Sequence, residues 1–188
     1  ASGDFDGDGL GAELVLTGPR GLYVFTSDGG QLIPNPDHVG LAVLAESCFL
    51  PPVLIPRDRT SEFDEAEPVD ACVVFENSGE SFLRLYHGAQ AEMSLEFPLG
   101  AVDVTAPPVF AWGQVVVAVH DPLLGENHLV FCDVGTDQVP GSEHSLTLDL
   151  DIRPGVFPVQ FGLIDPENGD PNSRYAIVPG LNGTAQTL

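Results

Sequence analysis

"ELVLTGPRGLYVFTSDGGQ" occupies residues 13–31, and "DACVVFENSGESFLRLYHGAQ" at residues 70–90 repeats its pattern. Each stretch opens with an acidic residue and an apolar run, turns through a polar link that contains glycine, and continues with a second apolar run. Both close on Gly-x-Gln. Short apolar runs bounded by turn residues are typical of β-strands, and helical spacing is absent from the chain. The repeat therefore predicts pairs of strands joined by tight turns.

The pattern recurs twice more. A looser copy spans residues 115–138, and a shorter one begins at residue 174. The four openings, at residues 13, 70, 115 and 174, are 57, 45 and 59 residues apart. A period of this length with several strands per unit is typical of β-propeller blades. Every unit except the first also has a lead-in strand, at residues 51–56, 107–112 and 157–164.

These units predict a single all-β domain with a β-propeller-like fold of about three to three and a half four-stranded antiparallel blades. The units span residues 1–50, 51–106, 107–156 and 157–188. We expect the inner strands to be buried on both faces; they are residues 14–16, 22–25, 72–75, 115–119 and 175–178. Because a typical propeller closes with about four to eight blades, further blades would come from the parent chain or a partner chain, or the units form an open arc.

The charge balance excludes some classes of partner. The 188 residues carry 28 acidic side chains against six basic ones, all arginine, for a formal net charge of −22. Such a surface repels nucleic acid and anionic membranes, and no apolar run is long enough to insert into a membrane. The absence of lysine favours a GC-rich or salt-adapted bacterial source. No signal peptide is evident, and the first residues already belong to a motif, so we expect a processed product or an excised piece. We expect the protein to be secreted or at the cell surface.

Residues 3–14, "GDFDGDGLGAEL", crowd three carboxylates into one loop. The side chains of Asp4, Asp6 and Asp8 alternate with smaller or apolar residues, and a hard cation would neutralise their repulsion. Ca²⁺ accepts six to eight oxygen ligands in flexible geometry, and the carbonyl of Leu10 would help complete the shell. Gly7 and Gly9 would let the turn close. The alternative is a solvated turn in which the aspartates bond to the backbone.

The apolar run after the loop separates this pattern from an EF-hand, which requires a glutamate at the twelfth position, where this chain has Val15. "DFDGDGLGAELVLTG" instead resembles an FG-GAP/VCBS-type repeat, the blade of integrin-α-like β-propellers. The resemblance implies a calcium site formed by the side chains of Asp4, Asp6 and Asp8 and the Leu10 carbonyl. The chain departs from the family pattern at residue 12, which is alanine, so Glu13 or a water would complete the shell.

Two further acidic loops precede later strands. "DPENGDPNSR", which contains Asp165, Glu167 and Asp170, resembles the first loop with an insertion. We predict a second calcium site there, with a solvated loop as the equal alternative. Residues 58–70 are longer and irregular, and we expect a solvated loop or a lost site.

The chain has no nucleophile elbow and no phosphate-binding glycine loop. Asp70, Ser81 and His87 lie in one unit, but nothing in the sequence orders them as a triad. His120, Asp121 and His128 could converge across a hairpin, although surface histidines are the commoner reading.

The three cysteines, Cys48, Cys72 and Cys132, have no zinc-site spacing. Because each lies in or beside an apolar run, we expect buried free thiols, with one disulfide and a spare thiol as the alternative.

These observations favour a non-enzymatic, calcium-binding module of FG-GAP type for extracellular or cell-surface binding of a protein or glycan. The alternative is a propeller or accessory domain of a secreted polysaccharide-acting hydrolase or lyase. The sequence excludes neither, because acidic pairs suited to glycoside hydrolysis are abundant in so acidic a chain.

Overall fold

The computed structural model describes fourteen stretches of the chain: residues 2–5, 7–9, 13–18, 21–28, 31–34, 50–57, 68–88, 92–104, 106–111, 113–134, 143–148, 160–163, 174–179 and 185–187. These residues form sixteen β-strands, and no α-helix occurs among them. The all-β prediction is therefore confirmed. In this described part of the chain, no helix has the length and hydropathy needed to cross a bilayer.

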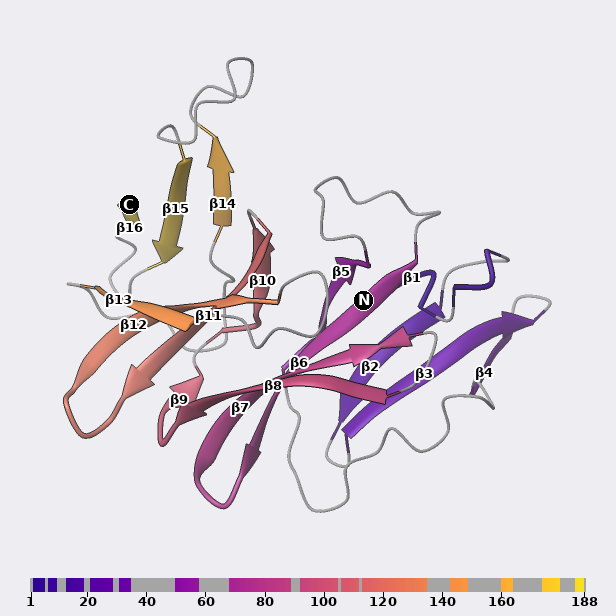
Figure 1. Ribbon diagram of the computed structural model, residues 1–188, viewed down its shortest axis with the longest axis horizontal. Helices are drawn as coiled ribbons and strands as arrows, with labels where there is room; N and C mark the ends of the chain where they lie inside the picture. Colours follow the sequence, from indigo (N-terminus) through magenta and orange to yellow (C-terminus); the bar gives the residue numbers. More distant parts are fainter. Residues whose placement is uncertain are drawn as a thin grey trace.

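The strands form four antiparallel sheets, and each sheet consists of strands that follow one another in the chain (Figure 1). The first sheet contains β1 (Ser2–Gly3), β2 (Glu13–Gly18), β3 (Gly21–Asp28) and β4 (Gln31–Pro34). The second sheet contains β5 (Val53–Pro56), β6 (Val69–Asn77), β7 (Glu80–His87) and β8 (Glu92–Gly100).

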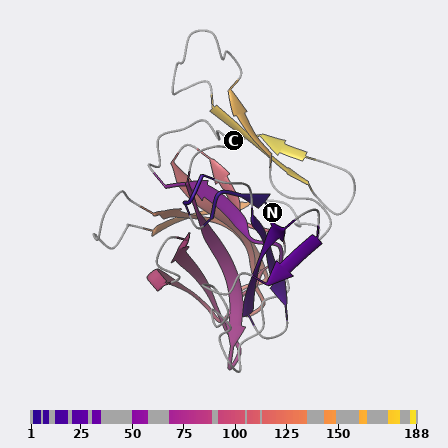
Figure 2. The same cartoon turned by 90° about the vertical axis from the view of Figure 1, so that its right-hand side faces the viewer.

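The third sheet contains β10 (Val109–Ala111), β11 (Gln114–Asp121), β12 (Glu126–Asp133) and β13 (Glu143–Leu148), and β9 (Asp103–Val104) also pairs with β11. The fourth contains β14 (Gln160–Leu163), β15 (Arg174–Pro179) and β16 (Ala185–Thr187). This last sheet lies at the top of both views (Figures 1 and 2). Each predicted unit thus supplies one sheet, except that β9, within the second unit, joins the third.

The lead-in strands are present as predicted, and the first unit has one as well. β1 is only two residues long, and Ser2 and Gly3 pair with Leu14 and Glu13 of β2. The expectation that the first unit lacks a lead-in strand was wrong, because two residues are too few to show any apolar periodicity.

The second sheet packs against a neighbour on each face. Ala71 and Val73 of β6 belong to a buried cluster that they share with Phe5, Val15, Leu22 and Val24 of the first unit. The alternate residues Cys72 and Val74 belong to a second cluster, shared with Val115, Val117, Val119 and Cys132 of the third sheet. Because successive side chains of a strand point to opposite faces, β6 contributes to two cores at once.

We predicted that the inner strands are buried on both faces. This is confirmed in the middle of the chain and wrong at its start. Residues 72–75 and 115–119 are all buried. In the first sheet, Val15, Leu22 and Val24 are buried, but Leu16 and Tyr23, which pair with each other across β2 and β3, are 41% and 37% exposed. The first sheet therefore has one covered face, because only the second sheet packs against it among the described residues. The burial of residues 175–178 lies outside the described side chains.

Cys72 and Cys132 are buried and form no disulfide, as expected, and Cys48 lies outside the described residues. Both sulfur atoms belong to the core between the second and third sheets. They pack there as small apolar side chains.

Candidate functional site

The acidic loop connects β1 to β2 and turns at two glycines. Gly7 and Gly9 have φ angles of 77° and 68°, in the left-handed region that glycine adopts without steric cost. The N–H of Gly7 donates a hydrogen bond to Oδ1 of Asp4 at 2.8 Å, so the first aspartate is buried against its own loop. Asp8 is exposed. Asp6 and Leu10 lie outside the described residues.

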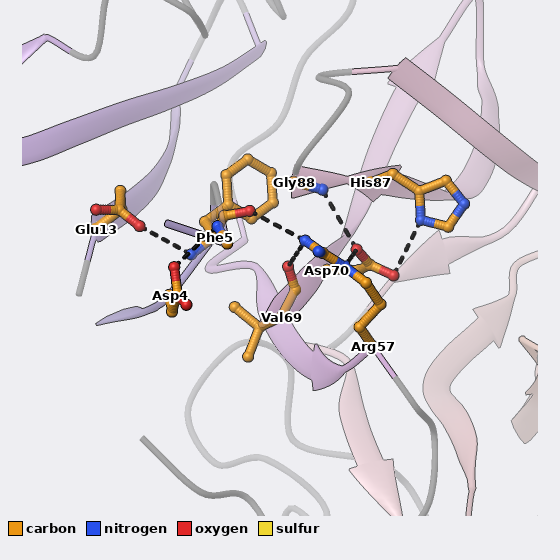
Figure 3. A network of polar contacts seen from close by, with 9 residues as sticks. Asp4, Phe5, Glu13, Arg57, Val69, Asp70, His87 and Gly88 are labelled. Atoms are coloured by element: carbon orange, nitrogen blue, oxygen red, sulfur yellow. Dashed lines mark hydrogen bonds and ion pairs between the residues drawn. The ribbon is translucent and has the colours of Figure 1, made fainter. Parts of the chain in front are cut away.

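Glu13 folds back onto the start of the loop. It begins β2, its side chain is buried, and its Oε2 accepts a hydrogen bond of 2.8 Å from the N–H of Phe5 (Figure 3). The register between β1 and β2 explains this contact, because Glu13 lies opposite Gly3 and therefore beside the residues that follow it. The acid that stands one place later than in the family pattern thus still reaches the loop.

Within the described ranges, no group of three or more His, Cys, Asp or Glu side chains is arranged to hold a metal ion. Asp4, Asp8 and Glu13 are the described members of the predicted calcium site. Their carboxylate oxygens are the donors that Ca²⁺ prefers, and the two left-handed glycines give the loop a tight turn. The residues of the second predicted site, Asp165, Glu167 and Asp170, lie outside the described part.

A buried polar network lies directly beside the loop, and its centre is Asp70 of β6 (Figure 3). The Asp70 side chain is 0% exposed. Its Oδ1 accepts hydrogen bonds from Arg57 Nε at 3.4 Å and from the N–H of Gly88 at 3.3 Å. Its Oδ2 lies 3.0 Å from His87 Nδ1. A buried carboxylate requires such partners, since an unpaired one carries a large desolvation cost.

This network corrects one expectation from the sequence. Residues 58–70 were expected to form a solvated loop or a lost site, but Asp70 is part of a strand and fully buried. The strand begins at Val69, so the last acid of the acidic run pairs with Ile55 of β5 instead of entering solvent. Residues 58–67 lie outside the described residues.

The same network joins the first sheet to the second. The N–H of Val69 donates to the Asp4 carbonyl at 2.9 Å, and Asp4 forms a parallel bridge with Pro68. Arg57 Nη2 reaches the carbonyl oxygens of Phe5 at 3.4 Å and Val69 at 3.5 Å. The Phe5 side chain is buried in the core between the two sheets. The loop is therefore held on the second sheet by the hydrogen bond between Val69 and Asp4, by the packing of the Phe5 ring and by the hydrogen bonds of Arg57.

The structure does not assemble the residues that would resemble a hydrolytic triad. Ser81 lies at the opposite end of β7 from His87, and its hydroxyl donates to the Val102 carbonyl at 2.8 Å. His120 Nδ1 lies 3.0 Å from Oδ1 of its cross-strand partner Asn127. His128 directly follows Asn127 in β12, so its side chain points to the other face of the hairpin. The two histidines therefore do not converge.

Sequence reasoning did not single out Arg57 and Gly88, the two residues that join the loop to Asp70. The sequence does contain a signal for Arg57, because it is one of only six basic residues and it directly precedes the acidic residues 58–70. Gly88 belongs to the Gly-x-Gln that closes the repeat. No family model, curated protein or solved structure matches the chain.

Proposed function

We propose that the chain is a calcium-binding, β-propeller-like module of FG-GAP type that binds a protein or glycan outside the cell or at its surface, without catalysis. The observation that carries this proposal is the β1–β2 loop. There Asp4 is buried, Asp8 is exposed, two glycines turn the backbone, and Glu13 folds back to the start.

The arrangement of the sheets supports a blade-like interpretation. Four sheets follow one another along the chain, and apart from β9, which pairs with β11, the strands of each sheet are in sequence order. The second sheet packs on the first through one face of β6 and on the third through the other. Propeller blades pack face to face in this way around a central channel.

The chemistry of the loop supports calcium. When bound, the ion would neutralise carboxylates that otherwise repel one another. The side chains of Asp4, Asp6 and Asp8 and the carbonyl of Leu10 would hold it, with Glu13 or a water completing the shell. Asp165, Glu167 and Asp170 would form a second site of the same kind. Outside the cell free calcium is plentiful, so sites of modest affinity stay filled.

The polar residues of the described part favour binding over catalysis. His87 is held by the buried Asp70, and the hydroxyl of Ser81 is bonded at the far end of β7. Neither arrangement presents a nucleophile beside its base. We therefore propose a binding role, with a propeller or accessory domain of a secreted polysaccharide-acting hydrolase or lyase as the second candidate.

Calorimetric titration of the metal-stripped chain tests the calcium site. Calcium should produce a saturable heat, and an equal concentration of magnesium should not abolish it, since magnesium requires stricter geometry. Free calcium at about a hundredfold above its Kd should stabilise the fold by about 2.7 kcal/mol, so a chelator should lower the Tm.

Two variants make this test specific to the loop. Asp6→Ala should abolish most of the calcium response, whereas Glu80→Ala removes an exposed acid from the β6–β7 hairpin and should leave the response unchanged. An unchanged melting curve in chelator, with no calcium-specific heat, would show that the aspartates form only a solvated turn.

A further inference from the structure

The turn between β11 and β12 carries the most exposed large apolar side chains of the described residues. Leu123 is 87% exposed and Leu124 is 67% exposed. The turn lies at the end of a long hairpin, at the lower left of Figure 1. Single exposed leucines are common on protein surfaces, but two adjacent ones at a projecting tip form a compact apolar feature.

The backbone of the turn is fixed without any contribution from these two side chains. Oδ1 of Asp121 accepts hydrogen bonds from the N–H groups of Leu123 at 2.8 Å and Leu124 at 3.1 Å. The N–H of Gly125 donates to the Asp121 carbonyl at 2.8 Å, and Gly125 has a φ of 68°. Pro122 fixes one further φ angle. A partner that binds the leucines would therefore lose little affinity to ordering of the loop.

The equivalent hairpin of the second sheet shows that the fold does not require an apolar tip. β6 and β7 are joined by Ser78 and Gly79, and residues 76–80 are all exposed and bear no large apolar side chain. Both hairpins belong to the repeated part of the chain, so the longer turn with its two leucines is a difference between otherwise similar units. Neither leucine belongs to a buried core cluster.

Charge around the tip indicates the kind of partner. The hairpin from Gln114 to Asp133 contains three carboxylates and no lysine or arginine. Glu126 follows the turn, with its side chain 49% exposed and 3.6 Å from His128. The whole chain has a net charge of −22. An anionic lipid surface would repel this tip, whereas a basic protein surface would attract it and accelerate association.

We propose that Leu123 and Leu124 form the anchor of a protein-binding surface, and that the partner offers an apolar pocket edged by lysine or arginine. This inference rests on the proposed binding role and specifies a protein as the ligand. It does not depend on the calcium site, so a negative calcium titration would leave it standing.

A peptide-display selection with the whole chain as target tests the proposal. The probe is a library of random peptides. Selection from such a library enriches peptides that bind surfaces already suited to binding. The selected peptides should combine apolar residues with lysine or arginine. The double variant L123S/L124S should weaken their binding by about a hundredfold, because each buried leucine contributes roughly a factor of ten. Leu16→Ser, which removes an exposed leucine from the first sheet, should leave binding unchanged.

Three results would overturn the proposal. The first is a set of selected peptides that bind L123S/L124S as tightly as the original chain while that variant keeps its Tm. The second is leucine-dependent binding of the chain to zwitterionic phosphatidylcholine vesicles, which would assign the tip to a lipid. The third is a leucine-dependent, concentration-dependent dimer in sedimentation, which would assign it to a second copy of the chain. Single variants at 123 and 124 separate the two contributions if the double variant loses its fold.

Discussion

Gly88 lies so close to Phe5 that a β-carbon at position 88 would stand 1.6 Å from the Phe5 carbonyl oxygen. The same oxygen accepts a hydrogen bond from Arg57, and the N–H of Gly88 donates to Asp70. Gly88 follows the last residue of β7, whereas Phe5 belongs to the acidic loop. The absence of one side chain therefore permits the loop to lie against the second sheet.

Gly88→Ala should be among the most destabilising small substitutions in the chain. The obstacle is backbone, which cannot rotate away, so we expect the free energy of unfolding to fall by about 3 kcal/mol. Gly3→Ala is the matched control, because its β-carbon would meet side-chain atoms of Val69 at 3.0 Å and Leu54 at 3.2 Å. These can shift, and the loss should be about 1 kcal/mol. Urea denaturation measures both, and equal losses would contradict the close approach.

Arg57 and Asp70 should be strongly coupled in a double-mutant cycle. Arg57→Met leaves a buried carboxylate with fewer partners and should cost about 2 kcal/mol, allowing for the partial exposure of Arg57. In the Asp70→Asn background the same change should cost much less. The pair Arg84 and Glu96, whose carboxylate is 35% exposed, provides the comparison, with a coupling below about 1 kcal/mol. A coupling no larger at Arg57 than at Arg84 would argue against the buried network.

Calcium should slow hydrogen exchange at the amide of Val69. Its N–H is bonded to the carbonyl of Asp4, the first residue of the proposed site, so ordering of the loop protects that bond. The amide of Val117 lies within the third sheet, paired with Val130, and is the internal control. Exchange followed by NMR with calcium and with chelator should change at Val69 and not at Val117. Equal protection of the Val69 amide with calcium and with chelator would show that calcium binding in the loop does not affect the junction of the first two sheets.

The β6–β7 turn should respond to the identity of residue 78. Ser78 and Gly79 have φ angles of 55° and 82°, as in the two-residue turns that favour Asn-Gly. Ser78→Asn should therefore raise the free energy of unfolding by about 0.5 kcal/mol, and Ser78→Val should lower it by about 1 kcal/mol. Thermal unfolding of the two variants measures the difference. A valine variant as stable as the asparagine variant would show that the turn does not hold this geometry.

Local pattern predicts the strands of this protein well, because alternation and turn residues are properties of neighbouring positions. The hairpins 13–28 and 69–87 follow directly from their apolar runs and glycines. The short β1 has no such pattern. The contacts that form the site junction, Gly88 with Phe5 and Arg57 with Asp70, join residues far apart in the chain. No local propensity specifies them, although Asp70 is the one acid of its run that directly precedes the apolar stretch of β6.

The alternating burial of β6 has a consequence for how such a chain originates. The second sheet packs on the first sheet through one face and on the third sheet through the other. It therefore contains both of the surfaces that join it to its neighbours. If the proposed repeat is correct, duplication of the gene segment that encodes such a sheet would add a layer that already fits both sides, and the array would lengthen without redesign of its cores. The two hairpins that pack around these cores end differently, in a Ser-Gly turn at residues 78–79 and in a leucine-bearing turn at residues 122–125, so the interior is compatible with either end.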